Sequence, residues 1–275
     1  MRKSPAERKY DKLLTRLAGL PSLLVAFSGG ADSTFLLAAA KKAVSGRLLA
    51  VTVRSPAFPT RDAEHADATA RLLEVEHKFM NSRMVENESF RANPTDRCYY
   101  CKYTIGTELL RLARKEGLAA VAEGTTADEL LGHRPGAMAV QELELLSPLA
   151  EMGLTKEEVR ELARREDVPN FDRPPGTCLA TRFPYGSEIT EGKLRDVEAV
   201  EQTIYDLGFR DVRCRHHGEF ARIELDPKEI PRSTIASIRK RIASKIHELG
   251  FKFATLDLDG YRTGSMGDDT EKKGR

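Results

Sequence analysis

The sequence predicts an α/β protein in which an N-terminal doubly wound parallel sheet is followed by a smaller α+β domain. Three observations predict this class. Short apolar segments alternate with helical patterns between residues 23 and 146, as in parallel sheets that helices cover on both faces. A serine- and glycine-rich turn joins the first apolar segment to the next helix. After residue 187 the order changes to helix, two strands, helix and strand.

The N-terminal half contains the alternating elements. A charged amphipathic helix is expected over 5–19, because its leucines recur at helical spacing. The apolar segments predict strands at 23–27, 48–53, 77–80, 119–123 and 143–146. The segments between them predict helices at 33–44, 61–74, 97–116 and 127–131.

The C-terminal half begins with a capping box, in which Thr155 and Glu158 start a helix. Residues 169–186 then contain four prolines and two glycines, which predicts a long irregular loop of the kind that is usually functional. Beyond it we expect a helix at 191–207, strands at 211–216 and 220–225, a helix at 235–249 and a strand at 252–258. The predicted organisation is therefore 1–168, a loop at 169–186, a second domain at 187–260 and a disordered tail at 261–275.

Composition restricts the class of protein. The 275 residues are 40% hydrophobic and 31% charged, as in ordinary globular proteins, and the formal net charge of +2 gives no strong field for binding polyanions. No apolar run reaches the roughly 18 residues that span a bilayer, so we expect a cytoplasmic protein that binds neither membrane nor nucleic acid. Four cysteines in a reducing compartment favour metal binding or catalysis over disulfides.

The turn after the first strand predicts a phosphate site. Gly29 and Gly30 let backbone N–H groups approach an anion, Ser28 and Ser33 can donate further hydrogen bonds, and the following helix adds its positive end. Since the lysine of a Walker loop is missing, the pattern instead resembles the pyrophosphate loop (PP-loop) of ATP pyrophosphatases, which form adenylates. Asp32 is expected to orient this loop or support Mg²⁺, with simple helix capping as the alternative.

Two further strand ends belong to the expected ATP site. Val53 and Arg54 end the second strand, where adenine lies in a sheet of this kind, and Gly124 follows the strand at 119–123.

The cysteines fall into two segments. Cys98 and Cys101 lie three residues apart at the start of the predicted helix 97–116, where the helix N-terminus favours thiolates. Cys178 lies in the loop at 169–186, from which we expect its thiol to move toward an activated substrate. A redox pair, a structural zinc site and an iron–sulfur cluster with one open iron all remain open interpretations. Unrelated buried thiols are the alternative, which suits Cys214 best.

Together these segments resemble the LarE-type ATP-dependent sulfur transferases, which make the pyridinium-based nickel-pincer cofactor of lactate racemase and related enzymes. The resemblance covers nearly all of residues 5–260. Residues 178–186 are its most specific mark, because they separate the family from tRNA-thiolating relatives with the same nucleotide loop. The other matching segments are 28–33, 96–102, 134–136 and 147–149.

The resemblance implies a reaction and a fold. The fold is a PP-loop domain of the adenine nucleotide alpha hydrolase type, and the substrates are ATP with Mg²⁺ and pyridinium-3,5-biscarboxylic acid mononucleotide. One carboxylate is adenylylated with release of pyrophosphate, and sulfur then replaces AMP to give a thiocarboxylate. The family also implies a homo-oligomer built from trimers.

The resemblance leaves the sulfur source open. In single-cysteine members the residue that matches Cys178 gives up its own sulfur and becomes dehydroalanine. Other members hold a [4Fe-4S] cluster through three cysteines that match Cys98, Cys101 and Cys178. This chain has all three, which favours the cluster.

The remaining site residues are charged. Arg213 and Arg215 resemble the substrate-phosphate ligands of the family, with two solvated arginines on an outward strand face as the alternative. Arg182 is expected to meet a carboxylate or the adenylate. Four acidic residues are weaker candidates, each little better than a surface charge: Glu123, Asp128, Glu151 and Glu201.

Two other functions stay open at this stage. A tRNA 2-thiolation enzyme has the same loop and three cysteines, but would need a basic RNA-binding extension. A non-enzymatic nucleotide-binding regulator with structural zinc is the second alternative.

Overall fold

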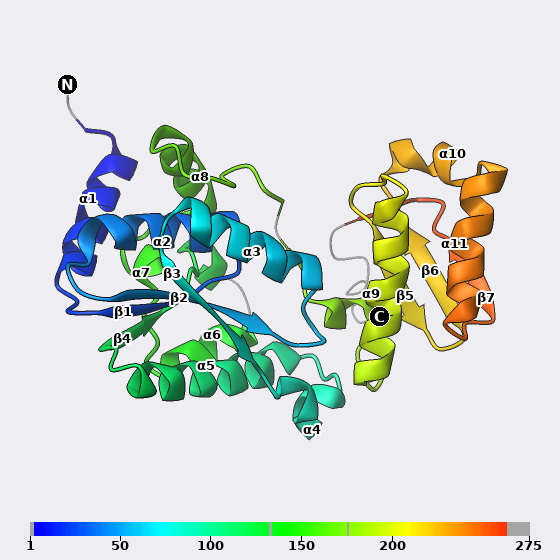
Figure 1. Ribbon diagram of the computed structural model, residues 1–275, viewed down its shortest axis with the longest axis horizontal. Coiled ribbons are helices and arrows are strands. Elements are labelled where there is room, and N and C mark those ends of the chain that lie inside the picture. Colours follow the sequence, from blue (N-terminus) through cyan, green and yellow to red (C-terminus); the bar gives the residue numbers. More distant parts are fainter. Residues whose placement is uncertain (1–2, 132–133, 175, 263–275) are drawn as a thin grey trace. The chain divides into compact units, whose positions relative to one another are not determined.

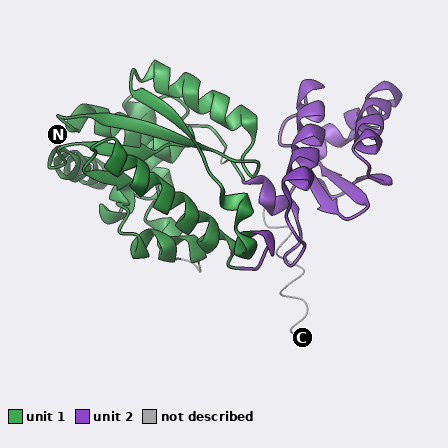
Figure 2. Ribbon diagram, turned by 60° about the horizontal axis from the view of Figure 1, so that its bottom comes forward, with its two compact units in different colours: residues 1–90, 96–177 green, residues 91–95, 178–275 purple. Residues whose placement is uncertain are grey.

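The computed structural model describes residues 3–131, 134–174 and 176–262. The chain forms two compact units, which Figure 2 shows in different colours. Unit 1 comprises residues 1–90 and 96–177, and unit 2 comprises residues 91–95 and 178–275. The predicted domain boundaries stay predictions. From residue 263 the predicted disordered tail lies outside the described residues.

Unit 1 is built on a parallel sheet with the order β3-β2-β1-β4, so the first strand is central (Figure 1). The strands are β1 (Leu23–Ala26), β2 (Leu48–Arg54), β3 (Glu76–Asn81) and β4 (Ala120–Ala122). Chain neighbours β1 and β2 pair in parallel, as do β2 and β3, which requires the crossover helices that the alternating pattern predicted. The α/β fold class is therefore confirmed.

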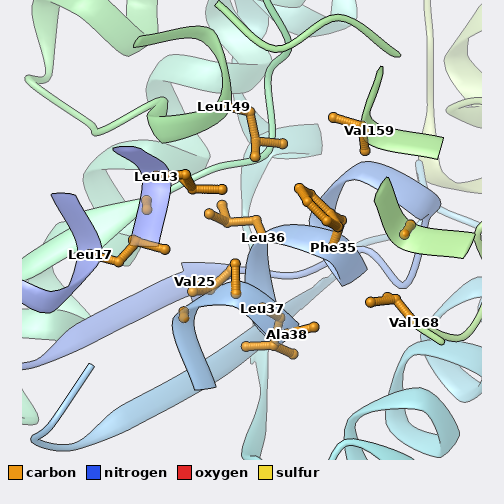
Figure 3. Packing of buried hydrophobic residues seen from close by; sticks show 14 of the residues in the cluster. Leu13, Leu17, Val25, Phe35, Leu36, Leu37, Ala38, Leu149, Val159 and Val168 are labelled. Atoms are coloured by element: carbon orange, nitrogen blue, oxygen red, sulfur yellow. The ribbon is translucent and has the colours of Figure 1, made fainter. Parts of the chain in front are cut away.

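Helices cover both faces of this sheet. Leu23 and Val25 of β1 join a core with α1 (Pro5–Ala18), α2 (Ala31–Ala43) and α8 (Lys156–Arg165), part of which Figure 3 shows. Leu24 points the other way, into a second core with Leu109 of α5 (Arg97–Lys115). Alternate residues of one strand thus enter two cores, as a doubly wound sheet requires. The other helices of unit 1 are α3 (Thr60–Leu72), α4 (Glu88–Arg91, whose last residue belongs to unit 2), α6 (Pro135–Glu142) and α7 (Pro148–Glu151), with short 3-10 turns η1 (Met84–Glu86) and η2 (Asp128–Leu131).

The predicted strand at 143–146 is wrong. These residues end α6: the amide of Leu145 donates to the carbonyl of Val140, and Glu144 adopts a positive φ of 54°. Only Leu146 reaches the sheet, as an isolated bridge to Ala122. The helix α6 was missed, and the segment predicted as a helix at 127–131 is the 3-10 turn η2. The capping box of Thr155 and Glu158 is confirmed at the start of α8.

Unit 2 contains a three-stranded sheet with the order β5-β6-β7. Its elements are η3 (Leu179–Arg182), α9 (Glu191–Asp206), β5 (Arg213–His217), β6 (Phe220–Glu224), η4 (Pro227–Glu229), α10 (Ile230–Ser233), α11 (Ala236–Glu248) and β7 (Phe253–Leu256). The turn at Gly218 joins the antiparallel pair β5 and β6, as predicted, and β7 pairs with β6 in parallel. No helix within the described ranges is long and apolar enough to cross a membrane.

A buried carboxylate joins three elements of unit 1 at the end of β4. Glu123 receives hydrogen bonds from Lys102 of α5 (2.8 Å), from the Ser147 hydroxyl before α7 (2.6 Å) and from Thr125 (2.6 Å). Burial by itself would raise the pKa of Glu123, but Lys102 and these hydroxyls outweigh it and lower the pKa below its usual range. Glu123 therefore anchors the cysteine-bearing helix α5 to the end of the sheet.

Glu123→Gln is expected to lower the free energy of unfolding by about 1–3 kcal/mol at pH 7, because a charged acceptor with three donors is lost. The folded-state pKa is lowered, so the stabilisation is present above the unfolded value, about 4.3, and is lost as pH falls through the folded value. Urea denaturation at pH 7 and at pH 4 should therefore show a difference that shrinks in acid. Glu161→Gln on the exposed side of α8 is the control, and an equal loss in both variants would contradict the anchoring role.

The turn between β1 and α2 depends on Gly29. Its φ is +71°, in the left-handed region that other residues rarely adopt. A Cβ at this position would also lie 2.9 Å from the Cα of Ala66, a fully buried residue of α3. The backbone conformation and the close approach to α3 both require glycine here.

Gly29→Ala should therefore destabilise the protein by about 1–3 kcal/mol through backbone strain and crowding against α3. A urea denaturation midpoint measures the change. Gly192→Ala is the matched control, because a Cβ there meets nothing within 4 Å and the site lies in the first turn of α9. If both variants unfold at the wild-type midpoint, the turn does not need glycine.

Candidate functional site

The loop 28–33, predicted to be a phosphate cradle, forms a compact turn in which its serine hydroxyls lie together. The Ser33 hydroxyl lies 3.1 Å from that of Ser28 and donates to the carbonyl of Gly30 at 3.2 Å. The amide of Gly30 donates to the Ser28 hydroxyl at 3.3 Å. Gly30 is the N-cap of α2 and supplies no side-chain cap, so the first-turn amides of this 13-residue helix keep their capacity to bind an anion.

Asp32 lies in the first turn of α2, and Gly30, not Asp32, is the N-cap residue. The alternative of simple helix capping is therefore wrong. Burial raises the pKa of Asp32, and the positive charge of Lys156 opposes this rise most strongly. A half-buried acidic group beside the predicted phosphate cradle has the chemistry to support Mg²⁺, which prefers carboxylate oxygens.

The two other predicted nucleotide segments lie at the same edge of the sheet, since parallel strands end together. Val53 and Arg54 end β2, and the Arg54 guanidinium lies over the Phe79 ring at 3.4 Å. Gly124 follows β4, and a Cβ there would lie 3.1 Å from the Cα and N of Ser33. The first turn of α2 therefore packs closely against the end of β4, and Gly124 leaves room for this contact beside the loop 28–33.

Cys98 and Cys101 lie together on the first turn of α5, as predicted. Cys98 is exposed, whereas Cys101 is partly buried, with its sulfur 3.7 Å from that of Met84. Gly136 of α6 packs on this turn, since its Cβ would lie 3.5 Å from the carbonyl oxygen of Cys98. The segment 134–136, singled out in the sequence, therefore shapes the surroundings of the cysteine pair.

Cys178 belongs to unit 2, and its backbone is held more firmly than an irregular loop would hold it. It immediately precedes the 3-10 turn η3. Its carbonyl accepts hydrogen bonds from the amide of Thr181 (3.0 Å), from the Thr181 hydroxyl (2.8 Å) and from the Arg182 guanidinium (3.3 Å). The expectation of a loop without regular structure across 169–186 is therefore corrected at residues 178–182.

The predicted metal ligands are Cys98, Cys101 and Cys178, and the structure places the first two in one unit and the third in the other. Within the described part of either unit, no group of three Cys, His, Asp or Glu side chains is arranged to hold a metal ion. The chemistry of the donor set still suits iron and sulfide, because thiolates are the ligands of iron–sulfur clusters. Cys214 is fully buried, and burial raises the pKa of its thiol, as for a structural cysteine.

The three predicted arginines are buried in unit 2. Arg215 pairs with Glu224 at 2.7 Å and donates to the carbonyl of Thr181 at 2.9 Å. Arg213 lies with its guanidinium 4.8 Å from the centre of the Tyr261 ring. The alternative of two solvated arginines is therefore wrong. Arg182 is 1% exposed and forms a forked pair with Glu201.

Sequence reasoning undervalued two of the acidic residues. Glu123 and Glu201, expected to be little better than surface charges, are both buried acceptors. Asp128 accepts from the amide of Lys156 and Glu151 pairs with Arg16, which are ordinary peripheral contacts. A glutamate at the end of a buried strand was the available signal for Glu123, whereas Glu201 lay in a helix with no local mark.

Known proteins resemble this chain along most of its length. The family model for asparagine synthase matches residues 14–173. An uncharacterized protein of Synechocystis sp. is 35% identical over 94% of this chain and 97% of its own. The pyridinium-3,5-bisthiocarboxylic acid mononucleotide synthase of Lactiplantibacillus plantarum is 33% identical over 96% of this chain and 95% of its own. An uncharacterized protein of Methanocaldococcus jannaschii is 27% identical over 88% and 91%.

The asparagine synthase model covers more than half of the chain, including the loop 28–33. The chain belongs to the family of the pyridinium-3,5-bisthiocarboxylic acid mononucleotide synthase, the LarE-type ATP-dependent sulfur transferases of the PP-loop superfamily.

Proposed function

We propose that this ATP-using sulfur transferase acts on pyridinium-3,5-biscarboxylic acid mononucleotide and converts a carboxylate to a thiocarboxylate, a step toward the nickel-pincer cofactor of lactate racemase and related enzymes. The observation that carries the proposal is the 33% identity, over 96% of the chain, to a synthase named for the product of that reaction. The cradle of Ser28, Gly30 and Ser33 supports it, because adenylylation requires a site for departing pyrophosphate.

The first step is adenylylation. A carboxylate oxygen of the substrate attacks the α-phosphorus of ATP, the bond to the bridging oxygen breaks, and pyrophosphate leaves. The first-turn amides of α2 and the hydroxyls of Ser28 and Ser33 contact the phosphates. Asp32 supports the Mg²⁺ that balances their charge. Val53, Arg54 and Gly124 line the ATP site along the ends of β2 and β4.

The second step is sulfur transfer to the acyl carbon, which breaks the bond to AMP. We propose that Cys98, Cys101 and Cys178 hold a [4Fe-4S] cluster, which when bound supplies sulfide at its open iron. The pair on the first turn of α5 favours this source over a sacrificial Cys178, because a sacrificial route needs neither Cys98 nor Cys101. In the sacrificial route, Cys178 sulfur would form a thioester and then leave its Cβ, giving dehydroalanine.

Arg213 and Arg215 are proposed to contact the substrate phosphate, since their guanidinium groups provide several N–H donors each. We further propose a cytoplasmic homo-oligomer built from trimers that acts on a small molecule and not on nucleic acid. Native mass spectrometry measures the assembly.

The substrate is tested by pyrophosphate release. With ATP and Mg²⁺, release should depend on the pyridinium dicarboxylate mononucleotide and rise with its concentration, because the carboxylate is the attacking group. The matched additions are nicotinic acid mononucleotide, which has one carboxylate, and unmodified tRNA. Release that depends on tRNA would instead support the thiolation alternative, and equal release without any acceptor would contradict both.

The sulfur source is tested with cysteine variants. Protein purified without oxygen should be brown, and Cys98→Ala and Cys101→Ala should lose that absorption because a thiolate ligand is missing. Cys214→Ala is the control and should stay brown. Cys178→Ala should stop thiocarboxylate formation but keep pyrophosphate release. Colourless wild-type protein whose mass falls by one H₂S after a turnover would establish the sacrificial route instead.

A further inference from the structure

We infer that Glu201 of α9 is a positioning residue for sulfur transfer, because it holds Arg182 where Arg182 fixes the backbone of Cys178. The inference rests on the proposed function of Cys178. It concerns unit 2 alone, since Glu201, Arg182 and Cys178 all belong to it.

Arg182 and Glu201 form a buried ion pair. Arg182 Nε lies 2.8 Å from Glu201 Oε1, and Arg182 Nη2 lies 3.0 Å from Glu201 Oε2. Their side chains are 1% and 4% exposed. A forked pair of this kind fixes the plane of the guanidinium, because two parallel hydrogen bonds remove its rotation.

The Arg182 guanidinium also contacts the backbone of Cys178. The remaining nitrogen, Nη1 of Arg182, donates to the carbonyl of Cys178 at 3.3 Å and to the Thr181 hydroxyl at 3.0 Å. The same carbonyl accepts from the amide and the hydroxyl of Thr181. The carbonyl carbon is bonded to Cα, which carries Cβ and, through it, the thiol, so these contacts fix the backbone position from which the thiol projects.

Glu201 is itself held by a contact with a neighbouring strand. Its Oε1 also accepts the amide of Cys214 in β5 at 2.9 Å. Glu201 therefore joins α9, the strand β5 and the turn η3 through one buried carboxylate. Arg215, paired with Glu224, holds the other end of the same turn by donating to the carbonyl of Thr181.

Stability alone does not account for this arrangement. A buried ion pair costs desolvation, and an apolar pair of similar volume often gives equal or greater stability. Burial opposes the charge on Arg182, yet Glu201, and to a lesser degree Cys178, raise the pKa of the guanidinium. What an apolar pair lacks is a directed donor for the Cys178 carbonyl, and a displacement of about 1 Å at a reacting group can cost about 100-fold in rate.

Two variants test the inference. Glu201→Gln leaves the Arg182 cation without its counter-charge. The double variant Arg182→Met/Glu201→Gln removes both charges together, so it should fold, while its glutamine still accepts the amide of Cys214. Both should form thiocarboxylate about 100-fold more slowly than wild type. The pyrophosphate burst of the first turnover should stay within about twofold, because the ATP contacts are proposed in unit 1 and the donors of Arg182 are directed to Glu201, Thr181 and the Cys178 carbonyl.

A second readout follows the turn directly. Hydrogen–deuterium exchange of a peptide covering residues 179–183 should be faster in both variants. The amide of Thr181 donates to the Cys178 carbonyl, and the Arg182 guanidinium no longer fixes that carbonyl. Glu191→Gln on the same helix is the matched control, because its partner Arg195 is exposed. It should leave both the exchange and the sulfur step unchanged.

The folded double variant decides the outcome. Wild-type rates of thiocarboxylate formation in it would overturn the inference, as would an equal loss of the burst and the sulfur step, which indicates general damage. A wild-type protein that releases no pyrophosphate with the mononucleotide would reject the proposed function. The exchange of residues 179–183 would still report whether Glu201 holds the turn.

Discussion

The close packing of the first turn of α2 is the constraint on which the nucleotide cradle depends. The residues around the start of α2 pack against Ala66 of α3 and against the end of β4. A Cβ at position 29 would crowd Ala66, and a Cβ at position 124 would crowd the first turn of α2, so glycine leaves the room needed at both positions. The helix N-terminus lies at the edge of the sheet, and the N-cap residue Gly30 supplies no side chain to cap it. The positive end of α2 and the neighbouring hydroxyls of Ser28 and Ser33 are the groups that an anion site requires.

Buried charge has a different use in each unit. In unit 1, Glu123 ties the cysteine-bearing helix α5 to the sheet through Lys102, next to the cradle. In unit 2, two buried ion pairs, Arg182–Glu201 and Arg215–Glu224, hold the turn after Cys178 by its carbonyls, through the two arginines. In both places a carboxylate orders a cation, and the cation orders a segment that carries a cysteine. Ion pairs of this type add direction more than stability, because desolvation offsets much of their attraction.

Much of the fold was predictable from local patterns. The apolar segments at 23–27, 48–53 and 77–80 became three neighbouring parallel strands, and the capping box at Thr155 started a helix. The prediction failed at 143–146, where an apolar segment of four residues suited a strand and a helix end equally well. Contacts with α6 decided in favour of the helix end, since the residues there satisfy its last carbonyls.

The sequence by itself determined the fold class, the glycine turn before α2 and the cysteine pair at the start of α5, because each depends on residues that are close in the chain. A glycine turn, a helix N-terminus and two cysteines three residues apart act through local backbone geometry. Only the tertiary structure decided the partners of the charged side chains. Glu201 resembled a surface charge in its helix, yet it is buried against Arg182 and the amide of Cys214, and these contacts join segments 13 and 19 residues away. Burial and pairing between distant segments depend on how the helices and strands pack, and no local pattern encodes them.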